Sequence, residues 1–593
     1  MSDYQAPTKD MLFVIRELAS LDQINTMPGF EEATVDLVEA ILEEAGQLAG
    51  EVIAPLNRIG DAKGTRVEDG RVIVAEEFIS VYRQFVSDGW TSISQSTKHG
   101  GQGLPYLVGL AVEEMMQSAC LAWSICTLLT QGAARAIEHH GDAELHALVL
   151  EKMVSGEWTG TMNLTEPQAG TDLAAVRSQA VPDGDGKGYR ITGQKIFITW
   201  GDHDMTDNVI HLVLARLVGA PDGVKGLSLF VVPKFRIGAD GSIGERNHVT
   251  PISVEHKLGI HGSPTCVLAF DDAYGYLLGE MNKGLACMFT MMNHARLSVG
   301  LEGVAISERA YQLALAYAKE RVQGNKVGYD AAVTIIKHPD VRRMLMHMKS
   351  HIEAMRALTY VAAAHLDRAH HHPDAAVRTS EQARLDLLTP IVKGWCTETG
   401  QELTSIGLQV HGGMGYIEET GAAQYMRDAR ITTIYEGTTG IQAADLVGRK
   451  ILRDRGVALQ SLIVDIKAID AELERHGDQL ATIRTALGES VDDLVGASEW
   501  LFAHAGANDD VAGAISFNFL MLAGTLMGGW QLARAAVVAA ECLAEGADDP
   551  SFYETKLVTA RFFAEQALPL TGAYRKAVES GGDATMTLSE EQF

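Results

Sequence analysis

Cysteine is scarce in this sequence, and its positions follow no recognisable pattern. Six cysteines are scattered over 593 residues, at positions 120, 126, 266, 287, 396 and 542. They form no CxxC pair and no metal-ligand spacing, and a small disulfide-stabilised fold needs a much higher density. The sequence therefore predicts no metal site and no disulfide scaffold, and it favours a reducing compartment. We expect a cytoplasmic protein.

Basic residues are also few relative to acidic ones. The chain has 49 Lys and Arg against 77 Asp and Glu, a formal net charge of −28. Such a field repels nucleic acid and anionic lipid unless a local basic patch reverses it. We therefore expect no nucleic-acid partner. Hydrophobic residues at 46% and charged residues at 21% are typical of a large globular protein with more than one domain.

Long uncharged runs are limited to two, and neither is uniformly apolar. The segments 115–134 and 511–533 are long enough to cross a bilayer, but Gly, Ser, Thr, Asn or Gln interrupt both. We expect helices buried by their neighbours and no integral membrane span. The N-terminal segment carries charges throughout and has no continuous apolar core, so the sequence predicts no secretory signal.

The hydrophobic periodicity changes along the chain and divides it into four parts. Helical spacing dominates from about residue 35 to 160, short β-branched runs broken by Gly and Pro follow, and the helical period returns at Gly284. Long antiparallel helices of a bundle are implied there, interrupted at 370–373, and a second helical block follows. The predicted fold is mainly α with a middle β domain, in domains 1–160, 161–283, 284–454 and 455–593.

Two loops beside the β runs carry groups that suit a flat polar ligand. The segment MNLTEPQAGTD, residues 162–172, offers hydroxyls and a glycine turn, which an ordinary loop also does. The segment KIFITWG, residues 195–201, places Phe197, Thr199 and Trp200 at a strand end. An aromatic face there stacks on a heterocycle, unless Phe197 belongs to the core.

A third segment, YEGTTGIQ at residues 435–442, precedes a predicted helix. Thr438 or Thr439 is a candidate N-cap, and Gly437 allows close backbone approach. The helix N-terminus suits an anion, with the carboxylate of Glu436 one step outside it. Taken alone, Glu436 also fits a solvated acid that interacts favourably with the helix dipole.

Eight segments in this order resemble the acyl-CoA dehydrogenase family between about residues 80 and 450. They are MNLTEPQAGTD, KIFIT, EHKLGIHGSPTC, NHARLSVG, YAKERVQG, LQVHGGMGY, MRDAR and IYEGTTGIQ. The resemblance implies an N-terminal helical domain, a β-barrel-like middle domain and a four-helix bundle, here followed by an additional helical domain. It implies FAD bound between the β domain and the bundle, and α,β-dehydrogenation of an acyl-CoA thioester. It also implies an electron-transfer flavoprotein as electron acceptor.

By this resemblance, Glu436 matches the catalytic base that removes the α-proton. Some relatives carry the base beside the position of Arg296, but the segment MNHAR has no carboxylate there, which favours Glu436. Exclusion of water by the acyl chain and flavin would raise the pKa of Glu436 towards neutrality. The matched substrate contacts are Thr171, Asn293, Arg296, Tyr435, Glu436 and Gly437.

The resemblance also assigns the cofactor contacts. Phe197 stands where many members have Trp, Trp200 where Asn is common, and Asn293 replaces a common Asp. Four positions match residues that reach the FAD of a partner subunit, so a homo-oligomer is implied, with a dimer favoured; these are Arg321, Gln323, Gln409 and Gly413. The other matched FAD contacts are Met162, Leu164, Thr165, Gly170, Thr171, Phe197, Thr199 and Thr438.

The extra N-terminal segment and the 455–593 block resemble the long members of the family. Among these are enzymes that act on 3-methylmercaptopropionyl-CoA, and our first expectation is oxidation of that thioether to 3-methylthioacryloyl-CoA in dimethylsulfoniopropionate demethylation. The alternatives are a broad-range fatty acyl-CoA dehydrogenase of β-oxidation and an acyl-CoA oxidase. A DNA-binding flavoprotein relative is disfavoured by the acidic balance and by the lack of a dense Lys/Arg run in 455–593.

Overall fold

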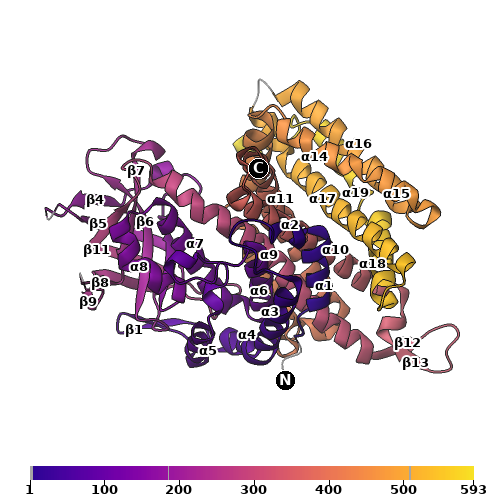
Figure 1. The fold of residues 1–593 in the computed structure, drawn as a ribbon, viewed down its shortest axis with the longest axis horizontal. Helices are drawn as coiled ribbons and strands as arrows, with labels where there is room; N and C mark the ends of the chain where they lie inside the picture. Colours follow the sequence, from indigo (N-terminus) through magenta and orange to yellow (C-terminus); the bar gives the residue numbers. More distant parts are fainter. Residues whose placement is uncertain (1–3, 185, 239, 506–508) are drawn as a thin grey trace. The chain divides into compact units, whose positions relative to one another are not determined.

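The computed structural model describes residues 4–184, 186–238, 240–505 and 509–593, and the chain forms two compact units. Unit 1 comprises the residues up to Ala6 together with Ala45–Ala295, and unit 2 comprises Pro7–Glu44 together with Arg296–Phe593. Two helices continue from one unit into the other along the chain, α3 (Val35–Gln47) and α9 (Gly284–Glu320) (Figure 1).

The first half of unit 1 is helical, as the periodicity predicts. In α5 the buried side chains Phe78, Tyr82 and Phe85 follow one another at four and three residues, which places them on one helix face. A two-stranded hairpin, β1 and β2, precedes this helix. The elements are α4 (Ala54–Lys63), β1 (Arg66–Glu68), β2 (Arg71–Ile73), α5 (Glu76–Ser87), α6 (Tyr106–Ala119), α7 (Leu121–His140) and α8 (Ala143–Ser155).

The uncharged segment 115–134 forms parts of two helices rather than one. Cys120 has φ −155° and ψ 94°, an extended conformation that ends α6 and begins α7. No glycine or proline marks this break in the sequence. Both helices are deeply buried, with α7 packed on strand β3, so this segment is core.

The β domain of unit 1 is a sheet that closes on itself. Strand β11 pairs with β5, β5 with β4, β4 with β6, β6 with β7, and β7 again with β11. This ring confirms the predicted barrel-like domain (Figure 1). The strands are β3 (Trp158–Asn163), β4 (Gln179–Pro182), β5 (Tyr189–Thr199), β6 (Asn208–Leu217), β7 (Leu227–Pro233), β8 (Phe235–Ile237), β9 (Ile243–Arg246), β10 (Val249–Val254) and β11 (Thr265–Leu278).

Unit 2 contains the long bundle helices. The predicted interruption at 370–373 separates α10 from α11, and the Asp374 side chain caps α11 by accepting from the Ala376 N–H at 2.8 Å. The elements are β12 (Val322–Asn325), β13 (Ala332–Thr334), α10 (Pro339–His371), α11 (Ala375–Val410), α12 (Ala422–Ala429) and α13 (Thr439–Ala444), with a π-helical segment at Asp445–Leu452.

The C-terminal block of unit 2 is helical, as predicted. Its helix α17 packs on α10 and α11, and by length and composition it is the one helix among the described residues that could cross a membrane. Within its most apolar window 61% of the residues are buried. The helices are α14 (Val457–Ala468), α15 (Asp470–Arg475), α16 (Ala481–His504), α17 (Asp509–Glu545), α18 (Pro550–Gln566) and α19 (Leu570–Glu579).

Within unit 2, buried charges join the N-terminal extension to the remaining helices. Helix α1 (Thr8–Phe13) carries Asp10, whose carboxylate lies 2.6 Å from the Arg356 guanidinium of α10 and also pairs with Lys556 of α18. Arg356 and Lys556 reach two further carboxylates, Glu308 and Glu353, at 2.8 and 2.9 Å. One network of charges thus joins the extension, the bundle and the C-terminal block.

Candidate active site

The residues singled out in the sequence fall into two groups, one in each unit. The unit 1 group lies at the ends of strands β3 and β5, in the loop that follows β3 and on the first turns of α9. The unit 2 group lies on α9, at the ends of α9 and α11, and in the turn before α13.

In unit 1, two strand ends bring candidate flavin contacts together. The Ile196 N–H donates to the Thr165 carbonyl at 2.9 Å, so the segment after β3 runs beside the end of β5. Thr165 and Thr199 are half-buried. Two hydroxyls therefore lie at one end of the barrel. Met162 and Leu164, whose backbone is matched to the flavin, are buried in the same region.

Phe197 on β5 and Trp200, which directly follows this strand, have different environments. Phe197 is 59% exposed, so it is not a core residue, and its φ of 60° lies in the left-handed region. Trp200 is fully buried, and its indole N–H donates to the Ala122 carbonyl at 3.1 Å. Phe197 is thus the ring available for stacking, while Trp200 anchors the strand end in the core.

A buried ion pair fixes the loop that carries Gly170 and Thr171. The Glu166 carboxylate lies 2.8 Å from the Lys195 ammonium group and accepts from the Ser178 hydroxyl at 2.6 Å. Burial alone would raise the pKa of Glu166, but Lys195 and these hydrogen bonds lower it to about 2. Gly170 and Thr171 themselves are exposed.

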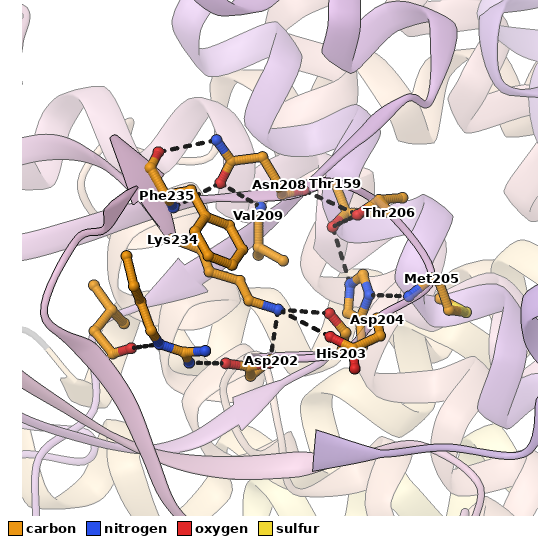
Figure 2. Close-up of polar contacts among 12 residues, drawn as sticks. Thr159, Asp202, His203, Asp204, Met205, Thr206, Asn208, Val209, Lys234 and Phe235 are labelled. Atoms are coloured by element: carbon orange, nitrogen blue, oxygen red, sulfur yellow. Dashed lines mark hydrogen bonds and ion pairs between the residues drawn. The ribbon is translucent and has the colours of Figure 1, made fainter. Parts of the chain in front are cut away.

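A second polar network holds the segment that follows β5. Figure 2 shows the Lys234 ammonium group donating to Asp202 at 2.9 Å and to the His203 carbonyl at 2.7 Å. The His203 ring bonds the Thr159 hydroxyl at 3.0 Å, and burial depresses its pKa well below the usual value. These hydrogen bonds tie the segment after β5 to strand β3 and to the end of β7. Sequence reasoning did not identify them.

In unit 2, Glu436 lies in a turn with unusual backbone geometry. Glu436 has φ 55° and Gly437 has φ 88°, so two successive residues take left-handed conformations. For a residue other than glycine this costs roughly 1–2 kcal/mol. Thr438 is the N-cap of α13, with its hydroxyl accepting from the Ile441 N–H at 3.3 Å, which decides between the two candidate caps.

Side chains of the bundle hold this turn in place. The Tyr435 hydroxyl donates to the Glu302 carboxylate of α9, and the Lys393 ammonium of α11 donates to the Gly437 carbonyl at 2.7 Å. The Gln442 amide donates to the Glu436 carbonyl at 3.2 Å. The left-handed turn is therefore fixed from both α9 and α11.

The electrostatic surroundings of Glu436 suit a base. Burial raises the pKa of Glu436 above its usual value, while the nearby cations Arg296 and Lys393 lower it. Arg296 is itself buried, 3.6 Å from the Asp445 carboxylate, and burial lowers its pKa too. Glu436 is thus a half-buried carboxylate of raised proton affinity, which favours a base over a fully solvated acid.

The remaining candidates are exposed. Asn293 is exposed on α9 in unit 1. In unit 2, the four residues matched to a partner's cofactor all lie on the surface. Arg321 and Gln323 stand where α9 gives way to β12, and Gln409 and Gly413 at the end of α11. Their roles stay predictions.

The unit 1 groups fit an isoalloxazine. An exposed aromatic ring held by a left-handed backbone, with two hydroxyls at the same strand ends, offers one stacking face and polar partners to a flat heterocycle that has a polar edge. In the described part of the chain, no three His, Cys, Asp or Glu side chains gather as metal ligands.

Models of one protein family match nearly the whole chain. They are the acyl-CoA dehydrogenase N-terminal domain over residues 37–157, the middle domain over 161–273 and the C-terminal domain over 282–452. A domain described as acetyl-CoA dehydrogenase C-terminal like matches residues 465–589.

Full-length relatives agree with these matches. The chain is 48% identical to 3-methylmercaptopropionyl-CoA dehydrogenase of Ruegeria pomeroyi, over 99% of this chain and 100% of that one. It is 37% identical to the broad-specificity linear acyl-CoA dehydrogenase FadE5 of Mycobacterium tuberculosis, over 100% of both chains.

The fold also matches a solved structure, an acyl-CoA dehydrogenase from Bacillus anthracis complexed with FAD. The TM-score is 0.75 at 20% identity, over 94% of this chain and 90% of that one. The chain therefore belongs to the acyl-CoA dehydrogenase family and is an FAD-dependent oxidoreductase that acts on acyl-CoA thioesters.

Proposed function

We propose that this enzyme dehydrogenates an acyl-CoA between Cα and Cβ with Glu436 as the base. The observation that supports this most strongly is the turn at 435–437, which holds a carboxylate of raised pKa in a strained conformation beside two cations. Strained backbone and perturbed carboxylates are concentrated at catalytic sites.

The residues of the turn have separate tasks in this reaction. The Glu436 carboxylate takes the α-proton, and its burial makes it a stronger base than a solvated acid. The backbone N–H of Glu436 polarises the thioester carbonyl, where negative charge develops as the α-proton leaves. FAD, when bound, would supply the acceptor for the hydride that leaves Cβ. Phe197, Thr165 and Thr199 would hold its ring.

We propose 3-methylmercaptopropionyl-CoA as the preferred substrate, oxidised to 3-methylthioacryloyl-CoA. Identity of 48% over the whole length to an enzyme named for that substrate supports this choice. A thioether sulfur is nearly isosteric with methylene and only weakly polar, so pocket residues need not look distinctive. The second candidate is a broad range of linear acyl-CoAs, which the 37% identical FadE5 favours.

A panel of acyl-CoAs with a dye acceptor separates the two candidates. It contains 3-methylmercaptopropionyl-CoA, its straight-chain isostere pentanoyl-CoA, butyryl-CoA, octanoyl-CoA and one long chain. We expect kcat/KM for the thioether to exceed that for pentanoyl-CoA by about tenfold, since one weakly polar atom contributes on the order of 1 kcal/mol. Equal values for the two isosteres would contradict the thioether assignment and support the broad-range alternative.

We further propose a homodimer that passes electrons to an electron-transfer flavoprotein in the cytoplasm. The resemblance assigns Arg321 and Gln409 to the FAD of the partner subunit, and their exposure leaves them accessible to another copy. A monomer would then bind its cofactor incompletely.

A further inference from the structure

Lys393 is a fully buried lysine on α11 whose role the proposed reaction does not explain. Its side chain has no exposed surface. Removing an ammonium group from water is costly unless other groups compensate. Three carboxylates act on it, with Glu436 contributing more than Glu302 and Glu398. The carboxylate that influences this lysine most is therefore the proposed base itself.

The hydrogen bond of Lys393 acts on the turn directly. Its Nζ donates to the Gly437 carbonyl at 2.7 Å, immediately after the residue that carries the base. The other group near that carbonyl, the Gln442 amide, is 3.4 Å away and also donates to the Glu436 carbonyl. Lys393 thus provides the shortest link between the bundle and the two left-handed residues.

The charge of Lys393 acts on the base through space. Burial raises the pKa of Glu436, and Arg296 and Lys393 oppose that rise. Burial also lowers the pKa of Lys393, to about 8, so its ammonium form is present at neutral pH and is lost in mildly alkaline solution.

We propose that Lys393 is a positioning residue for Glu436. Its ammonium group fixes the Gly437 carbonyl, and so the direction of the neighbouring carboxylate, and its positive charge stabilises the ionised form of that carboxylate. Lys393 holds its own proton throughout and does not touch the substrate. The inference rests on the proposed role of Glu436 as base.

The variant Lys393→Met tests this, because Met keeps the unbranched apolar stem and removes both donor and charge. We expect the rate of flavin reduction in single turnovers at neutral pH to fall at least tenfold, with KM changed little. In a plot of this rate against pH, the fall on the acid side (the acid limb) should move to higher pH by about one unit. The reason is that loss of a nearby cation raises the pKa of a carboxylate.

Lys556→Met is the matched control. Lys556 is also buried in unit 2, and it pairs with Asp10 and Glu353 rather than with the turn. This variant should lose stability and keep the acid limb of the wild-type protein. A purely structural role for Lys393 predicts the same behaviour for both variants.

The wild-type protein supplies a readout that needs no variant. Its reduction rate should fall above about pH 8 as Lys393 loses its proton. An unchanged acid limb in Lys393→Met would overturn the inference. If that variant does not fold, a wild-type rate that stays flat to about pH 9 overturns it. Failure of the proposed function looks different, because wild-type protein would then show no flavin reduction with any acyl-CoA.

Discussion

At the residue scale, buried charges in this protein have two different roles, one structural and one proposed to be catalytic. Glu166 and Lys195 form a closed pair in unit 1 that fixes a loop, whereas Glu436 in unit 2 is close to cations but keeps a raised pKa. The difference lies in direct hydrogen bonds. Glu166 accepts five, from Lys195, both donors of Ser178, the Arg177 N–H and the Gln168 amide, and these stabilise its ionised form.

Removing the Glu166 charge should therefore destabilise unit 1. In Glu166→Gln a buried ammonium loses its counter-ion, and we expect the free energy of unfolding at pH 7 to fall by about 3 kcal/mol. The wild-type protein has the higher free energy of unfolding only while Glu166 is ionised. This difference is fully present above the carboxyl pKa of the unfolded chain, about 4, and it is lost as the pH falls towards the folded-state pKa of about 2. Urea unfolding at several pH values measures this. A gap between the two proteins that does not narrow below about pH 4 would contradict the account.

At the element scale, the contact between α11 and α17 depends on two glycines of α17, which have no side chain at the contact. A Cβ at Gly524 would lie 2.2 Å from the Trp395 ring, and one at Gly528 would lie 2.6 Å from it. The indole of α11 thus packs directly on the backbone of α17. The additional C-terminal block is in this way attached to the bundle helix that also carries Lys393.

The variant Gly524→Ala tests that packing. The added methyl group has no room, so we expect a loss of about 1–3 kcal/mol from the free energy of unfolding. Gly513→Ala is the control on the same helix, since a Cβ there meets nothing within 4 Å, and it should stabilise by up to about 1 kcal/mol. Thermal unfolding compares the two variants, and equal midpoints would contradict a tight contact at Trp395.

Sequence patterns predict elements well where one signal dominates. The run NVIHLVLARL coincides with β6 because a continuous apolar run fits a strand buried on both faces. The break at Cys120 was not predictable, since only its backbone conformation marks it. Glu436 was identified through its motif, whereas Lys393 and Glu302 were not. Lys393 lies 44 residues from its partner in the turn and Glu302 lies 133 residues from its own. The local sequence of a helix does not indicate such distant contacts.

At the scale of the whole molecule, the proposed dimer predicts complementation between two inactive variants. Arg321→Ala impairs the cofactor site of the partner, and Glu436→Gln inactivates its own site. In a mixed dimer one site then carries both changes and the other carries neither. The purified mixed dimer should therefore show about half of wild-type activity, and an unseparated mixture of equal amounts about a quarter.

The measurement uses co-expression with two tags and an assay of the doubly purified dimer. If both residues served the same subunit's site, each site of a mixed dimer would carry one lesion and activity would stay absent. That outcome, or a monomer in light scattering, would contradict the proposed assembly.

The most direct test of the account is anaerobic reduction of the bound flavin by acyl-CoA in Glu436→Gln. Gln preserves the size of the side chain and removes the base. We expect the variant to bind FAD with the wild-type absorption spectrum and to bind acyl-CoA. Its flavin should not be bleached on the timescale of wild-type turnover. Bleaching by the variant at a rate near that of the wild-type protein would show that another group removes the α-proton, and would contradict the assignment of Glu436.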